Sequence, residues 1–282
     1  MDIRLKLYFS TIKKRGFIMN PILVILQRQY STIQTELTRY RNNPYDPERV
    51  HDLRVSIRTL RGLFKFLKRA LSPTSFATID GFLSQAAKIF SSLRDIDVLI
   101  IKSSEFAYAH PQESNNYRQL FHDLHVERAQ KMRSSITKTT IKKLTDYLTR
   151  VKKQLDVLNF NKDIDWSIYI SDELKRRKNK LFKLYTDLDF QDYSRVHQIR
   201  KKAKTLRYAA DYFAEVTSKN TQKIHKKAKQ IQKKCGIITD AHVNYELLQY
   251  LATQTKSNDV KKILLRIAQT QHDIFASTKK DV

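Results

Sequence analysis

The chain has 282 residues, of which 41% are hydrophobic, so it can bury a substantial core in one large domain or two smaller ones. Only 4 Gly and 5 Pro are present, which excludes turn-rich β-sandwiches and barrels and predicts an all-α fold of long helices. The net charge of +26 predicts a polyanionic partner, such as nucleic acid, an acidic membrane or a phosphate polymer, because so many like charges otherwise oppose folding.

Near the N-terminus, the apolar run Phe17–Leu26 follows three cationic residues. It lacks a small-residue cleavage site and is too short to span a bilayer, so we expect no transmembrane segment and interpret it as the start of a core helix. Residues 1–19 are expected to precede this helix as an extension, with Met19 as an alternative start. The single cysteine, Cys235, cannot form an intrachain disulfide, which favours a reducing cytoplasm.

Hydrophobic periodicity predicts four helices in each half of the chain. In the first half they cover residues 20–42, 47–70, 75–104 and 113–157, and in the second half residues 166–187, 192–215, 219–254 and 257–278. The segment Leu158–Trp166 interrupts the helical pattern. We therefore divide the chain into an N-terminal four-helix bundle over residues 20–160 and a C-terminal four-helix bundle over residues 161–282.

The two halves share sequence features that indicate an internal duplication. The segment Asp46–Leu67 resembles Asp192–Phe213, with a Val-His pair and a later Leu-Arg pair aligned. Downstream, Asp95 and Asp240 are separated by almost the same offset as His51 and His197. Two motifs at nearly one offset predict two bundles related by a pseudo-twofold axis.

A row of cations follows the first repeat beside its apolar face. The apolar positions are Val50, Leu53, Ile57, Leu60, Phe64, Leu67 and Leu71, and the basic positions one residue on are His51, Arg54, Arg58, Arg61, Lys65 and Lys68. One residue turns a helix by about 100°, so the basic row flanks the buried face, where a groove between helices forms. Asp52 is the only acid between His51 and Ala70, and an uncompensated cationic row of this kind favours anion binding over a solvated surface.

The second repeat has the same design. Its apolar face comprises Val196, Ile199, Ala203, Leu206, Ala210 and Phe213, and its cations are His197, Arg200, Lys201, Lys204 and Arg207, with Tyr208 beside them. A further acid-free helix over residues 221–235 adds Lys226 and Lys233 as candidate ligands. Because a guanidinium matches two phosphate oxygens, the arginine-rich first row favours phosphate.

Acids and histidines near these rows have two interpretations. Asp95, Asp97 and Asp240 are expected to orient the guanidinium groups of the groove, with a divalent-metal set as the weaker alternative. His51 and His197 are interpreted as anion or local hydrogen-bond partners in preference to metal ligands. We predict no metal site, no catalytic residue and no cofactor.

The motifs HDLRVSIRTLR (His51–Arg61), LRDIDVL (Leu93–Leu99) and HQIRKKAKTLRY (His197–Tyr208) resemble those of the CHAD family, the conserved histidine α-helical domain. The likeness covers nearly the whole chain from about residue 20, although the second downstream segment, Gly236–His242, lacks the Arg that precedes Asp95. The resemblance implies two four-helix bundles with a basic central pore or groove, and non-catalytic binding of inorganic polyphosphate. It also implies the ligand contacts His51, Arg54, Arg58, Arg61, His197, Arg200, Lys201, Lys204, Arg207 and Tyr208.

Three functions remain distinguishable at this level. The first is binding of polyphosphate, with association with cytoplasmic polyphosphate granules. The second is sequence-nonspecific binding of RNA or DNA, which is less favoured because the basic rows lack the aromatic residues on which bases stack. The third is the role of an accessory subunit to a polyphosphate-metabolising enzyme, since no nucleotide-binding loop or nucleophile motif is present in the chain. The sequence does not determine the oligomeric state.

Overall fold

The computed structural model describes residues 20–111, 117–160, 164–217 and 220–277. Within these ranges the chain forms ten α-helices and one short 3-10 helix, with no strand, which confirms the all-α prediction. The α-helices are α2 (Pro21–Asn42), α3 (Pro47–Leu67), α4 (Pro73–Lys88), α5 (Ser91–Ala109), α6 (Tyr117–Ser135), α7 (Lys138–Asp156), α8 (Trp166–Thr186), α9 (Tyr193–Tyr212), α10 (Gln222–Gln254) and α11 (Asn258–Ser277). The predicted N-terminal extension and the alternative start at Met19 lie outside the described residues.

Side-chain caps and prolines define most helix starts. Asp46, Ser72 and Thr137 accept hydrogen bonds from free backbone N–H groups in the first turns of α3, α4 and α7. Pro47 and Pro73 are the first residues of α3 and α4, where the missing proline N–H removes no helical hydrogen bond. These boundaries therefore follow from local chemistry.

The first half contains more helices than its periodicity predicts. The expected helix over residues 75–104 is two helices, α4 and α5, with a turn at residues 89 and 90 between them. The ring of Phe90 in this turn packs edge-on against Tyr40, with centroids 5.2 Å apart. The expected helix over residues 113–157 is likewise divided into α6 and α7, and Thr137 caps the second of them. The four-helix count was wrong for this half, whereas the four helices of the second half lie where they are expected.

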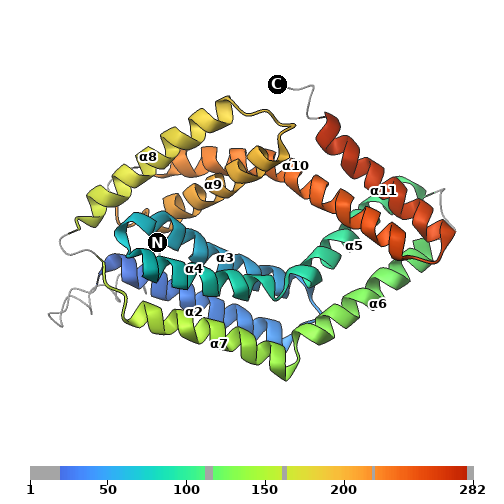
Figure 1. Ribbon diagram of the computed structural model, residues 1–282, viewed down its shortest axis with the longest axis horizontal. Helices are drawn as coiled ribbons and strands as arrows, with labels where there is room; N and C mark the ends of the chain where they lie inside the picture. Colours follow the sequence, from blue (N-terminus) through green and yellow to red (C-terminus); the bar gives the residue numbers. More distant parts are fainter. Residues whose placement is uncertain (1–19, 112–116, 161–163, 218–219, 278–282) are drawn as a thin grey trace.

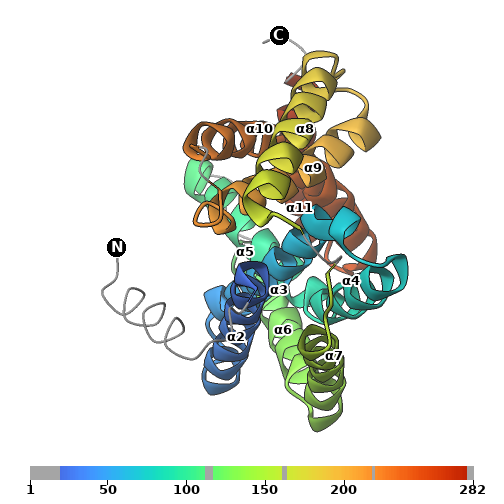
Figure 2. The ribbon, with the colours of Figure 1, turned by 90° about the vertical axis from the view of Figure 1, so that its left-hand side faces the viewer.

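The helices form a ring (Figure 1). Helix α3 packs against α2, α4, α5 and α9, while α9 packs against α10 and α10 against α11. The C-terminal helix α11 in turn contacts α5 and α6, so the two halves meet at α3–α9 and again at α11. In a view from the side, α8, α9 and α10 lie at one end of the molecule and α2, α6 and α7 at the other (Figure 2). The division into two duplicated bundles stays a prediction.

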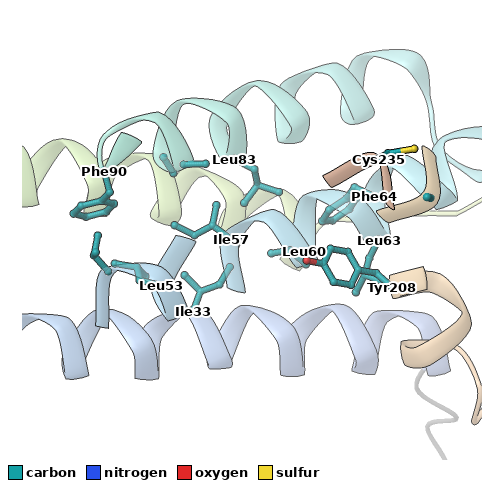
Figure 3. Packing of buried hydrophobic residues seen from close by; sticks show 14 of the residues in the cluster. Ile33, Leu53, Ile57, Leu60, Leu63, Phe64, Leu83, Phe90, Tyr208 and Cys235 are labelled. Carbon is teal, nitrogen blue, oxygen red and sulfur yellow. The ribbon is translucent and has the colours of Figure 1, made fainter. Parts of the chain in front are cut away.

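Helix α3 forms the centre of the hydrophobic core. The seven apolar positions predicted for its buried face are all buried, as are the six predicted on α9. Across the α3–α9 contact, Tyr208 lies beside Leu60 and Leu63 (Figure 3) and is only 8% exposed. The predicted apolar faces are therefore confirmed, and they place the two basic rows on neighbouring helices.

The close approach of α3 and α9 leaves little room for a side chain at position 62. A Cβ atom on Gly62 would lie 3.0 Å from Cδ2 of Tyr208, whereas one on Gly81, which is exposed on α4, would meet no atom within 4 Å. We expect Gly62→Ala to lower the free energy of unfolding by about 1 kcal/mol, because overpacking outweighs the gain in helix propensity. Gly81→Ala, which gains the propensity alone, should raise it by roughly 0.5–1 kcal/mol. Urea unfolding of both variants measures the difference, and equal effects would contradict the tight α3–α9 contact.

Candidate polyanion-binding cavity

A cavity of about 730 Å³ lies inside the ring, bounded by α3, α5, α9, α10 and α11. Its charged lining is dominated by cations. They are Arg54 and Arg58 of α3, Arg94 and Lys102 of α5, Arg200, Lys204 and Arg207 of α9, and Lys229 and Lys233 of α10. The carboxylates of Asp95 and Asp240 are the acids that line the same space among the described residues. The cavity is therefore strongly positive.

Helical periodicity explains why each helix contributes several lining residues. Side chains three, four or seven positions apart share one face of a helix. On α9 this relation holds for Arg200, Lys204 and Arg207, and on α10 it holds for Lys229, Lys233 and Gly236. The glycine leaves space next to the guanidinium of Arg200, whose Nε would lie 3.5 Å from a Cβ atom at that position.

The cations of the cavity are incompletely compensated. Arg200 pairs with Asp240 at 3.0 Å, and Arg54 donates to the backbone carbonyl of Phe90 at 2.8 Å. Over the described parts of the chain, the Nε atoms of Arg54, Arg58 and Arg200 are buried without a hydrogen-bond partner. A buried donor without a partner costs about 1–3 kcal/mol, and more when it is charged. The side chains of these three arginines line the cavity, where an anion would offset their uncompensated charge.

Burial and mutual repulsion weaken the protonated state of these groups. Burial, assisted by the charges of Arg58 and Arg200, lowers the pKa of Lys204 to about 7. Burial and the charge of Arg58 lower the pKa of Arg54 to about 10. The pKa of Arg58 is also lowered, chiefly by burial. A bound polyanion would favour the protonated forms of these side chains and raise their pKa values.

Stability should consequently depend on pH through Lys204. The pKa of Lys204 is lowered to about 7 in the folded chain from 10.5, so the unfolded chain binds more protons between these values. In the absence of an anion, the unfolding free energy should therefore rise as the pH increases from about 7 to 10, by an amount that Lys204→Met reduces. Urea titrations at several pH values, at fixed salt, measure this slope. If the unfolding free energy of the wild type and of Lys204→Met changed with pH by the same amount, the lowered pKa of Lys204 would be contradicted.

The two motif histidines occupy different environments. His51 lines the cavity, and burial together with the charge of Arg94 lowers its pKa. His197 lies outside the lining, where its ring stacks on Tyr193 with centroids 6.0 Å apart. The Nδ1 atom of His197 is buried and has no hydrogen-bond partner in the described chain. The similarity of the two sequence motifs does not extend to their position relative to the cavity.

The structure brings nine of the predicted charged residues to the cavity. These are His51, Arg54, Arg58, Arg200, Lys204, Arg207, Lys233, Asp95 and Asp240. On α3 and α9 the signal was a basic row one position beside an apolar face, and it brought Arg54, Arg58, Arg200, Lys204 and Arg207 to the cavity because the two helices pack on each other. The two acids come from other helices, Asp95 from α5 and Asp240 from α10.

Several predicted ligands do not line the cavity, which corrects their expected placement. Arg61 makes a bidentate pair with Asp80 of α4, at 2.7 and 3.0 Å, and Lys65 lies 3.9 Å from the same carboxylate. Tyr208 is buried between α3 and α9, and Lys201 and Lys226 are exposed outside the cavity. Asp80 offsets the charges of Arg61 and Lys65 from a neighbouring helix, so the sequence of α3 alone gives no sign of this contact.

Asp97 also differs from its expected placement. It was predicted to orient the guanidinium groups of the groove, but it is buried and accepts a hydrogen bond from Nε of Arg128 at 2.6 Å. This pair connects α5 to α6, away from the cavity lining. Asp97 therefore stabilises a helix contact.

Six polar lining residues were not among the sequence-based candidates. They are Arg94 and Lys102 of α5, Lys229, Gln232 and Asn244 of α10, and Gln271 of α11. On α5 the lining residues follow helical spacing: Arg94, Asp95, Val98 and Lys102. Once Asp95 was chosen as a candidate, this spacing could have predicted Arg94 and Lys102 as well. Gln232 carries no charge and gives no comparable signal.

The comparisons with known proteins bear on this arrangement. The family model described as "CHAD domain" matches residues 24–249, which is more than half of the chain. The chain belongs to the CHAD family. The resemblance of its three motifs to that family is thereby confirmed, and so is the helical fold that it implied.

Two solved structures show the same fold at low sequence identity. The crystal structure of the CHAD domain from the plant Ricinus communis superposes with a TM-score of 0.69 at 19% identity, covering 90% of this chain and 86% of that one. PptA from Streptomyces chartreusis gives a TM-score of 0.69 at 11% identity, covering 92% of this chain and 95% of its own. The comparison with curated proteins found no match.

Two further observations concern this CHAD chain as a whole. Among the described helices, none combines the length and apolar character needed to cross a membrane. In the same residues, no three His, Cys, Asp or Glu side chains gather as candidate metal ligands.

Proposed function

We propose that this CHAD protein binds inorganic polyphosphate, without acting on it chemically, in the cavity between α3, α5, α9, α10 and α11. One observation carries the proposal: nine lysine and arginine side chains line that cavity, and only two carboxylates among the described residues line it with them. Several guanidinium donors there are buried without partners in the described chain. A polymer carrying about one negative charge per phosphate would compensate them. The family resemblance implies the same ligand.

The lining favours polyphosphate over RNA or DNA. Sequence-tolerant binding of single strands combines cations with aromatic rings on which bases stack. The apolar part of this lining, over the described residues, is aliphatic: Val98, Ile237, Ala241, Val243, Leu247 and Ile274. Arginine forks beside aliphatic walls suit a phosphate chain that has no bases.

Polyphosphate should raise the melting temperature of the protein. A ligand at 100 times its dissociation constant stabilises the fold by about 2.7 kcal/mol, which corresponds to a rise of several degrees for a chain of this size. The measurement is thermal unfolding with long-chain polyphosphate and with single-stranded RNA of equal total charge, at several salt concentrations. We expect a larger rise with polyphosphate and a steep loss of affinity with salt. An equal rise with RNA would remove the preference for polyphosphate, and a flat salt response would exclude binding through many phosphates.

The proposal includes the absence of catalysis and a location. Incubation of polyphosphate with the protein should leave its chain length unchanged on a gel, and chain shortening would show that the protein is an enzyme. We place the protein in the cytoplasm, in association with polyphosphate granules, where it recruits or stores the polymer. Co-sedimentation with isolated granules, lost when Arg58 is replaced by Glu, tests this location.

A further inference from the structure

A second pocket lies on another face of α10, and its walls are mainly aromatic. It has a volume of about 310 Å³, and we call it the aromatic pocket. Besides two aliphatic residues, its lining consists of Phe190, Gln191, Tyr193, His242, His272 and Phe275. Ile238 and His242 of α10 line this pocket, whereas Ile237 and Ala241, about 100° away around the same helix, line the polyanion cavity. Helix α10 therefore contributes a wall to each of two distinct spaces.

Three helices bring the rings of the aromatic pocket together. Tyr193 is the first residue of α9, and Phe190 and Gln191 precede it in the turn after α8. His272 and Phe275 are three residues apart on α11 and so share one face of that helix. The imidazole of His242 contacts both neighbours, with its centroid 3.9 Å from that of Tyr193 and 5.7 Å from that of Phe275.

The protein does not fully cover these rings. Tyr193, His242, His272 and Phe275 are each partly exposed, whereas the core ring of Phe213 is completely buried. Phe275 meets the imidazoles of His242 and His272 edge-on, at interplanar angles of 72° and 66°. Edge-on pairs leave ring surface that a flat ligand can cover, and removing such surface from water is favourable.

The aromatic pocket offers hydrogen-bonding groups but no permanent charge. Its lining, over the described residues, includes no Lys, Arg, Asp or Glu, although 29% of the chain is charged. The backbone N–H of Gln191 donates to Asp189 at 2.9 Å, while the side-chain amide has no partner among the described residues. Nε2 of His242 lies 3.3 Å from the carboxylate of Glu246, which leaves Nδ1 for a ligand. The pocket thus has donors and acceptors for an uncharged polar molecule.

We propose that the aromatic pocket binds an uncharged planar nitrogen heterocycle of the size of a purine base. Its volume is at the lower end of the range for small-ligand sites, about 300–1,000 Å³. Aromatic side chains stack on the face of such a heterocycle, and the amide and imidazole groups match the nitrogen and oxygen atoms at its edge. This site is independent of the proposed binding of polyphosphate.

Two other ligand classes fit the aromatic pocket less well. An organic cation, which aromatic cages also bind, is disfavoured because no carboxylate lines the described pocket and the chain carries a net charge of +26. A phosphate group finds no cation in the lining. In a nucleotide, the base would therefore enter and the phosphate would stay outside, where the ammonium of Lys234 lies 5.2 Å from the centroid of the Phe190 ring.

The test uses adenosine, which carries a purine base without a phosphate and so has no charge for the polyanion cavity to attract. Isothermal titration calorimetry gives its affinity for the wild type, for Tyr193→Leu and for Tyr250→Leu. Tyr250 is 59% exposed on α10 and lies outside the pocket, so its replacement is the matched control for the loss of a ring. Ribose and choline are titrated in parallel. Circular dichroism verifies folding, and Phe275→Leu replaces Tyr193→Leu if the latter does not fold.

We expect the wild type to bind adenosine and Tyr193→Leu to bind it about tenfold more weakly, a loss of about 1.4 kcal/mol that is typical of one base stacked on one ring. Tyr193→Phe, which keeps the ring and removes only the hydroxyl, should lose about threefold at most. The affinity of Tyr193→Leu for polyphosphate should stay within about twofold, because this residue does not line the polyanion cavity. The inference is overturned if the wild type does not bind adenosine, if Tyr250→Leu loses as much affinity as Tyr193→Leu, or if ribose or choline binds as tightly as adenosine.

Discussion

Replacing Arg58 with glutamate should weaken polyphosphate binding by at least about 100-fold. Arg58 lies in the cavity, its Nε atom is buried without a partner in the described chain, and burial lowers the pKa of its guanidinium. Truncating one partner of a buried charged contact costs about 2–5 kcal/mol, and reversing the charge adds repulsion between the carboxylate and the phosphates. Fluorescence or calorimetric titration with long-chain polyphosphate at fixed ionic strength measures the loss.

Two further variants separate this local effect from a change in net charge. Arg133→Glu, at an exposed position on α6, makes the same change in charge away from the cavity and should alter the affinity by less than threefold, or about 0.6 kcal/mol. Arg58→Met should weaken binding yet raise the melting temperature of the unliganded protein, because it removes one of several cations that repel each other. Unchanged affinity in Arg58→Glu would show that the polymer binds elsewhere. Equal losses in Arg58→Glu and Arg133→Glu would show that only net charge matters.

Replacing Asp97 with alanine should lower the free energy of unfolding by about 3–5 kcal/mol, because it leaves a guanidinium buried without its counter-charge. Arg128 is the partner, and its side chain is only 11% exposed while that of Asp97 is 1% exposed. Chemical denaturation measures the loss. The double variant Asp97→Leu, Arg128→Met should recover most of the stability, since an apolar pair of similar volume has no charge to desolvate.

The same variants distinguish the two roles considered for Asp97. If it stabilises the α5–α6 contact, the double variant binds polyphosphate with wild-type affinity once it is folded. If Asp97 orients the arginines of the cavity, as its sequence position suggested, the double variant binds weakly in spite of its restored stability. The observed pair with Arg128 favours the first result.

Local patterns predicted the fold class and much of the cavity. Scarce glycine and proline indicated long helices, and the spacing of Leu53, Ile57 and Leu60 identified the face of α3 that is buried. The one-residue offset then placed Arg54 and Arg58 beside that face, where the structure has them in the cavity. Periodicity was less informative about helix ends, because the apolar pattern continues through the turn at residues 89 and 90, where α4 ends and α5 begins.

Arg58 and Arg61 show the limit of this approach. They belong to the same basic row, one turn apart on the same helix, and nothing in their immediate sequence distinguishes them. In the folded chain Arg58 lines the cavity, whereas Arg61 pairs with Asp80 of α4. The amino-acid sequence alone determined which faces are apolar and which are basic, because these depend on the regular rotation of the helix. Tertiary packing alone decided that Arg61 meets a carboxylate while Arg58 lines the cavity, because Asp80, the partner of Arg61, belongs to a different helix.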